Sequence, residues 1–108
     1  LHMNDEHRQN VLAACRNAPE SHLVVIHGTD TMAETAKVVG EAGLAKTIVF
    51  TGAMIPYSVA GSDALFNLGF AMAQAQAQAH GTYVAMNARI FAWDAVRKNR
   101  GDGVFEEV

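Results

Sequence analysis

The fold is decided by the stretch LVVIHGTDT (residues 23–31), in which a short apolar run passes directly into a polar turn. The apolar part, residues 23–26, is rich in β-branched side chains that do not alternate with polar ones, which is typical of a strand covered on both faces. Apolar residues at helical spacing follow from Met32, and Thr31 with Glu34 predicts a capping box at the start of that helix. The stretch therefore predicts a buried strand, a turn and a helix in immediate succession.

The same pattern extends to both sides of this stretch. Apolar runs at residues 47–50 and 82–86 predict two more buried strands. Helices are predicted over residues 5–17 and over 62–79, the second capped by its first residue, and an irregular apolar run at 90–96 predicts one short additional strand. Because strands that alternate with helices imply a parallel sheet, we expect an α/β fold of three layers (α/β/α) with a mostly parallel sheet, Rossmann-like or flavodoxin-like.

Length and composition narrow the class of protein. Half of the 108 residues are hydrophobic and 18% are charged, which suits one domain over residues 1–108. The net charge of −3 gives no basic field to attract phosphates, so we expect no nucleic-acid partner. No apolar run approaches the ~18 residues of a membrane helix, so we expect no membrane partner. Cys15 is the only cysteine, which favours a reducing compartment and hence the cytoplasm.

Polar residues that could do chemistry lie at the ends of the predicted strands, where parallel sheets bind their ligands. In the first turn, Thr29 offers a hydroxyl that could donate or attack, and Asp30 could bind a substrate ammonium group. The alternative from the local pattern is that Asp30 and Thr31 only cap the helix. Thr51 ends the second strand and could line the same crevice. The candidate substrate-binding residues are thus Gly28, Thr29, Asp30 and Thr51.

A threonine hydroxyl attacks only when a base takes its proton, and Lys98 is a candidate for that base. Nothing in the spacing joins Lys98 to Thr29, and a lysine between Arg97 and Asn99 is usually exposed, so the residues alone leave the pairing open. His27 could shuttle protons, but a histidine beside a glycine turn is more often structural. The remaining histidines show no metal-ligand spacing, and we expect neither a metal nor a cofactor.

Several short motifs follow one another across nearly the whole chain. They are VIHGTDTM (25–32), TGAM-x-P (51–56), SDA-x-x-NL (62–68), VAMN (84–87) and VRKN (96–99). In sequence and in order they resemble motifs of the bacterial and archaeal L-asparaginase family, whose members hydrolyse the side-chain amide of asparagine. Motifs in register over this length are far more specific than any one of them alone.

The resemblance implies roles that spacing could not assign. Thr29 would be the second of the family's two active-site threonines, paired with Lys98 and with the adjacent Asp30. Asp30 would also contact the α-ammonium group of the substrate. The implied catalytic residues are therefore Thr29, Asp30 and Lys98, in an amidohydrolase that converts asparagine, or glutamine, to the acid and ammonia. Separately, a sheet without flanking strands would expose unpaired, apolar edges, from which we expect a homo-oligomer.

The sequence also departs from the family pattern. It contains no Thr-Gly-Gly-Thr-like turn, so the family's first, attacking threonine has no counterpart. Residues 1–3 (Leu-His-Met) are similar to the tail of the family's carboxylate-binding Asp-Ser motif, although residues left from cloning are an alternative. The chain thus resembles the middle of a larger domain, as a fragment or a truncated member. A noncatalytic remnant that binds an amino acid or oligomerises is the alternative function, and a related amidotransferase subunit is a third.

Overall fold

The computed structural model of the chain describes residues 4–55, 61–99 and 101–108. Two parts of the sequence interpretation lie outside these residues: the motif tail at residues 1–3 and the proline that ends the 51–56 motif. Among the helices of the described part, none is long and apolar enough to cross a lipid bilayer.

The centre of the molecule is a four-stranded sheet in the order β1-β2-β3-β4. Strands β1 (His22–Ile26), β2 (Thr47–Thr51) and β3 (Gly81–Met86) are parallel. Strand β4 (Arg89–Ala92) pairs with β3 in the antiparallel direction through a tight turn. The mostly parallel sheet is as predicted, and β4 is the additional strand expected in the 90–96 run, beginning one residue earlier.

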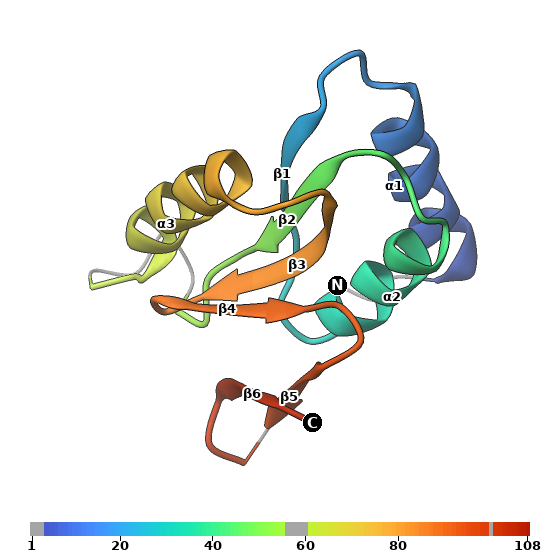
Figure 1. Cartoon of the computed structure of the whole chain (residues 1–108). Helices are drawn as coiled ribbons and strands as arrows, with labels where there is room; N and C mark the ends of the chain where they lie inside the picture. The colour runs from blue at the N-terminus through green and yellow to red at the C-terminus, as the bar shows by residue number, and fades with distance from the viewer. Residues whose placement is uncertain (1–3, 56–60, 100) are drawn as a thin grey trace.

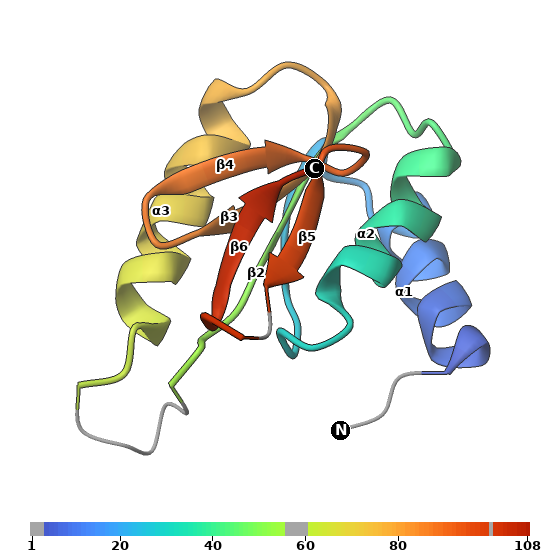
Figure 2. The ribbon, with the colours of Figure 1, turned by 90° about the horizontal axis from the view of Figure 1, so that it is seen from below.

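Helices cover both faces of this sheet, as Figures 1 and 2 show. Helices α1 (Asp5–Asn17) and α2 (Met32–Glu41) lie on one side, and α3 (Ala64–Ala77) lies on the other. Helix α2 packs on the sheet and α1 packs on α2. The predicted three-layer α/β/α architecture is therefore confirmed.

The ends of the helices differ from the sequence prediction in detail. Thr31 is the N-cap residue of α2, but its side chain makes no capping hydrogen bond, so the expected capping box does not form. The N-cap of α3 is Asp63 rather than Ser62. The Ser62 hydroxyl accepts from the backbone N–H of Ala64 and donates to the Ile55 carbonyl. The Asp63 side chain makes no capping hydrogen bond.

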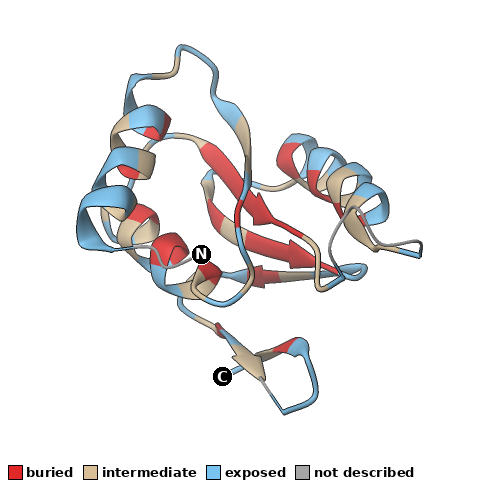
Figure 3. Cartoon of the chain, turned by 180° about the vertical axis from the view of Figure 1, so that it is seen from behind, coloured by how far each residue is buried: buried red, intermediate tan, exposed pale blue. Residues whose placement is uncertain are grey.

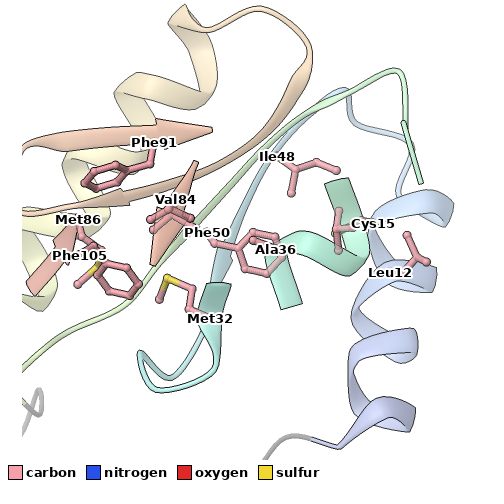
Figure 4. Close-up of a cluster of buried hydrophobic side chains, with 12 residues drawn as sticks. Leu12, Cys15, Met32, Ala36, Ile48, Phe50, Val84, Met86, Phe91 and Phe105 are labelled. Atoms are coloured by element: carbon pink, nitrogen blue, oxygen red, sulfur yellow. The ribbon is translucent and has the colours of Figure 1, made fainter. Parts of the chain in front are cut away.

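Most of the core lies between the sheet and the α1–α2 layer. Its buried side chains include those in Figure 4: Met32 and Ala36 of α2, Ile48 and Phe50 of β2, Val84 of β3, and Phe91 of β4. A smaller cluster of Val49, Ala71, Ala75 and Ala85 joins α3 to the opposite face. Strand β2 is buried throughout, and Figure 3 shows the buried stretches of the central strands.

Strand β1 is less buried than its sequence predicts. Its three central residues are only partly buried, and Ile26 is 70% exposed. The prediction that this strand is covered on both faces was wrong because, among the residues that the structure describes, β1 is an edge of the sheet and pairs only with β2. The structure therefore presents an apolar strand at an open edge.

A second, two-stranded sheet forms the end of the chain and was not predicted. Strands β5 (Val96–Asn99) and β6 (Val104–Glu107) make an antiparallel hairpin below α2 and β4 in Figure 1. Val96 and Phe105 are buried in the main core and fix this hairpin to it. This hairpin carries Lys98.

Candidate functional site

Three side chains that are distant in sequence meet at the carboxyl end of β1. The Lys98 ammonium group donates to Thr29 Oγ1 at 2.9 Å and to Asp30 Oδ1 at 2.7 Å. The lysine side chain is 13% exposed and the aspartate side chain is 75% exposed. The expectation that a lysine in this position is solvent-exposed therefore does not hold, and the pairing that spacing left open is present.

The β5–β6 hairpin brings Lys98 to this position. Lys98 and Phe105 are directly opposite in the antiparallel register, so their side chains project from the same face of the hairpin. Phe105 is buried in the core, and Lys98 beside it reaches Thr29. The neighbouring Arg97 projects from the other face and pairs with Glu106. Sequence reasoning missed Phe105, since one buried aromatic residue in a four-residue strand gives no periodic signal.

His27 holds the turn that carries Thr29 and Asp30. Its backbone N–H donates to the Thr51 carbonyl at 2.9 Å, which continues the β1–β2 ladder. Because a carbonyl can only accept, ring atom Nδ1 donates to the Gly28 carbonyl (2.6 Å). Ring atom Nε2 is paired with the Thr35 hydroxyl in α2 at 2.8 Å. His27 thus connects strand, turn and helix, in agreement with the structural role that the sequence favoured for it.

A pocket of about 520 Å³ opens beside the three side chains. Its polar wall includes Thr29, Asp30 and Lys98, and its apolar wall includes Val11 of α1 and Met54 of the loop after β2. The volume lies within the usual range of small-molecule sites, roughly 300–1,000 Å³. The backbone of Gly28 also lines it, so three of the four candidate substrate-binding residues share one pocket.

Thr51, the fourth candidate, lies apart from them. Its hydroxyl is buried and donates to the Ala85 carbonyl at 2.7 Å. Thr51 lines a neighbouring, more apolar pocket with Gly28, Gly52 and Leu65. The hydroxyl is therefore engaged inside the sheet, and the loop backbone that follows is what this strand end presents to a ligand.

The arrangement is suited to acid–base chemistry on a small zwitterion. An exposed carboxylate at the mouth of a pocket can bind an ammonium group, and a lysine in contact with a hydroxyl can transfer a proton to or from it. Within residues 4–55, 61–99 and 101–108, His, Cys, Asp and Glu side chains do not gather in any group that could hold a metal ion.

Comparison with known families assigns this architecture. The model of the asparaginase N-terminal domain matches residues 1–105. The chain belongs to the asparaginase family. It is 38% identical over 89 residues to the curated "Probable L-asparaginase 4" of Schizosaccharomyces pombe, and the match covers 78% of this chain.

Solved asparaginases have the same fold. The thermostable L-asparaginase of Thermococcus kodakarensis superimposes with a TM-score of 0.90 and 28% identity over 98% of this chain. L-asparaginase I of Vibrio cholerae superimposes with a TM-score of 0.82 and 27% identity over 97% of it. The chain spans 34% of each of these proteins and 25% of the S. pombe asparaginase. It therefore corresponds to part of an asparaginase N-terminal domain.

Proposed function

We propose that the chain supplies half of the active site of an asparaginase-type amidohydrolase, which converts asparagine and water to aspartate and ammonia. The observation that carries the proposal is the contact of Lys98 Nζ with both Thr29 Oγ1 and Asp30 Oδ1. A family match over residues 1–105 supports it. Glutamine, one methylene longer, is the second candidate substrate.

The pocket beside Thr29 indicates how the substrate would be held. The α-ammonium group would lie against the Asp30 carboxylate, which is the exposed member of the set. The side-chain amide would then reach Thr29, with Lys98 as the group that exchanges a proton through the threonine hydroxyl. The Nζ of Lys98 lies 2.9 Å from Thr29 Oγ1, within reach of the proton that it would exchange.

The attacking group would come from outside these 108 residues. The family resemblance implies an attacking threonine on a glycine-rich turn, and this sequence has no such turn. Thr29 with Lys98 is the pair that assists that attack and the hydrolysis of the acyl intermediate. The composite site would be completed by further polypeptide or by a partner.

The experiment has two readouts on the purified chain. We expect titration with L-asparagine to shift the NMR signals of Thr29, Asp30 and Lys98, and Lys98→Met to abolish the shifts at Thr29 and Asp30. Lys37→Met, an exposed lysine of α2, is the matched control and should leave them intact. We expect ammonia release at least about a hundredfold below that of a complete site, since the attacking group is missing.

Each readout can contradict the proposal. An absence of shifts at these three residues at saturating asparagine would refute the binding site. Rapid ammonia release by the chain alone would show that Thr29 itself attacks and that the site is whole. Shifts that persist in Lys98→Met would favour the alternative of a noncatalytic amino-acid-binding remnant.

The open edge of the sheet supports a homo-oligomer. Ile26 at the end of β1 is 70% exposed, and Leu65 of α3 beside it is 67% exposed. Unpaired strand edges with apolar side chains readily pair with another chain. Light scattering should give a dimer or larger species, and a monomer at high concentration would refute this.

The single buried thiol of Cys15 suits a reducing compartment, and we place the protein in the cytoplasm.

A further inference from the structure

A hydrogen-bonded cluster of Asp63, Asn67 and Asn87 lies behind the loop that follows β2. The Asp63 carboxylate accepts from the Met54 and Ile55 backbone N–H groups, each at 3.1 Å. It also accepts from the side-chain amides of Asn67 at 2.9 Å and Asn87 at 3.1 Å. Four donors from three segments of the chain thus converge on one carboxylate.

Asn67 is the buried centre of this cluster, with none of its surface exposed. Its side-chain amide donates to the Gly52 carbonyl at 2.8 Å, and its carbonyl oxygen accepts from the Asn87 backbone N–H at 2.9 Å. A buried amide that is satisfied on both sides holds its partners at fixed positions. The cluster therefore ties α3 to the ends of both β2 and β3.

The charge of Asp63 is favoured by these contacts. Burial acts to raise the pKa of its carboxyl, but the hydrogen bonds from Ile55, Asn87, Met54 and Asn67 outweigh burial and hold the pKa below its ordinary value. Such hydrogen bonds favour the charged form of a carboxyl group. Asp63 is thus a carboxylate at neutral pH, and its four hydrogen bonds are charge-assisted.

Two contacts connect this cluster to the pocket. Met54, whose N–H is held by Asp63, lines the same pocket as Thr29 and Lys98. Gly52, whose carbonyl is held by Asn67, lies so close to β1 that a Cβ there would come within 2.3 Å of the His27 carbonyl oxygen. The loop is therefore seated directly against the residue before the Gly28–Thr29 turn.

We infer that Asp63, Asn67 and Asn87 are positioning residues for the substrate pocket, setting the place of residues 52–55 relative to Thr29 and Lys98. The inference rests on the proposed function of that pocket. None of the three side chains lines the pocket, so their effect on a ligand passes through the loop. Because the cluster joins the ends of β2 and β3 to α3, its loss displaces one wall of the pocket and leaves Lys98 in place.

The test uses the complete chain, labelled with ¹⁵N, as wild type and as Asp63→Asn. We expect the Met54 and Ile55 amides to exchange with solvent at least about tenfold faster in Asp63→Asn, with the Val49 amide of β2 unchanged. We expect the dissociation constant for L-asparagine to rise about tenfold, the size of one lost charge-assisted hydrogen bond. Asp94→Asn, an exposed aspartate, is the control and should change neither.

Two further variants separate positioning from folding. Asp63→Glu retains the carboxylate and should recover part of the affinity. Asn87→Gly removes one donor to Asp63 at a residue with φ of 50°, which glycine tolerates. It should produce a smaller change in the same direction, and it serves as the test if Asp63→Asn does not fold.

The outcomes distinguish this inference from the proposed function. The positioning role alone would be overturned if the wild type binds asparagine but Asp63→Asn leaves the exchange of the Met54 and Ile55 amides unchanged. It would also be overturned if Asp63→Asn leaves the affinity for asparagine unchanged. No wild-type binding at all would overturn the proposed function, and the inference with it. Equal loss of affinity in Asp63→Asn and Asp63→Glu, in step with thermal stability, would show a general structural role and also overturn the inference.

Discussion

Thr35 is a buried residue, and the shape of the site depends on its side chain through His27. Its hydroxyl is paired with His27 Nε2 at 2.8 Å, and none of its surface is exposed. Thr35→Val keeps the volume but leaves the histidine nitrogen buried without that partner, a change that typically costs about 1–3 kcal/mol. We expect the free energy of unfolding in urea to fall by that amount. Thr29→Val removes a hydroxyl that is only partly buried and should cost less, so equal losses would contradict this account of His27.

The same residues show where sequence analysis succeeds and where it fails. The turn at Thr29 and Asp30 could be predicted because its strand and its helix are encoded by neighbouring residues. The partner Lys98 is 69 positions away, and it arrives only because a short hairpin is fixed by Phe105. The hydrogen bonds of Asp63 are hidden for a similar reason, since a Ser-Asp pair before a helix first suggests a cap.

Two glycines, Gly40 in the last turn of α2 and Gly69 inside α3, have surroundings that predict opposite effects of substitution. Gly40 of α2 lies against the ring of Trp93, where a Cβ would come within 2.3 Å of ring atoms. Gly69 of α3 has open space, with no atom within 4 Å of the position of a Cβ. Gly69→Ala should raise the free energy of unfolding by about 0.5–1 kcal/mol through helix propensity. Gly40→Ala should lower it, because the ring must move.

Thermal melting of both variants checks this prediction. Because the substitution is the same and both residues are helical, a lower melting temperature for Gly40→Ala than for Gly69→Ala reports the contact with Trp93. A higher melting temperature for Gly40→Ala than for Gly69→Ala would contradict the packing of Trp93 on α2.

Acid should unfold the whole molecule partly through Asp63. Burial acts to raise the pKa of its carboxyl group, but four hydrogen bonds outweigh burial, so the pKa is lowered in the folded chain. A carboxyl whose folded pKa is depressed contributes stability above its unfolded pKa of about 3.9, and that stability is lost as the pH falls through the folded value. We therefore expect the free energy of unfolding to decrease as the pH drops below about 4. The decrease should be less steep in Asp63→Asn. Equal slopes in the two proteins would contradict the charge assigned to Asp63.

The layered architecture of the whole molecule was largely predictable from the sequence, but the position of β1 at the edge of the sheet was not. Alternating strands and helices predict the three layers and the parallel order, because each element is long enough to show its own period. The sequence of β1 indicates a strand covered on both faces, yet the strand is an edge here. A local pattern records how apolar a strand is but not which neighbour covers it. The half-exposed strand therefore agrees with a chain that spans 34% of its structural relatives.

The central claim is that Thr29, Asp30 and Lys98 form a working half of an amidohydrolase site. The most direct test is ammonia release from asparagine by a chimera in which this chain replaces the superimposed segment of the T. kodakarensis L-asparaginase. We predict an active chimera and, in its Lys98→Met form, a loss of about 10²- to 10⁴-fold in kcat/KM. A folded chimera without activity, or equal activity with Lys98→Met, would contradict the claim.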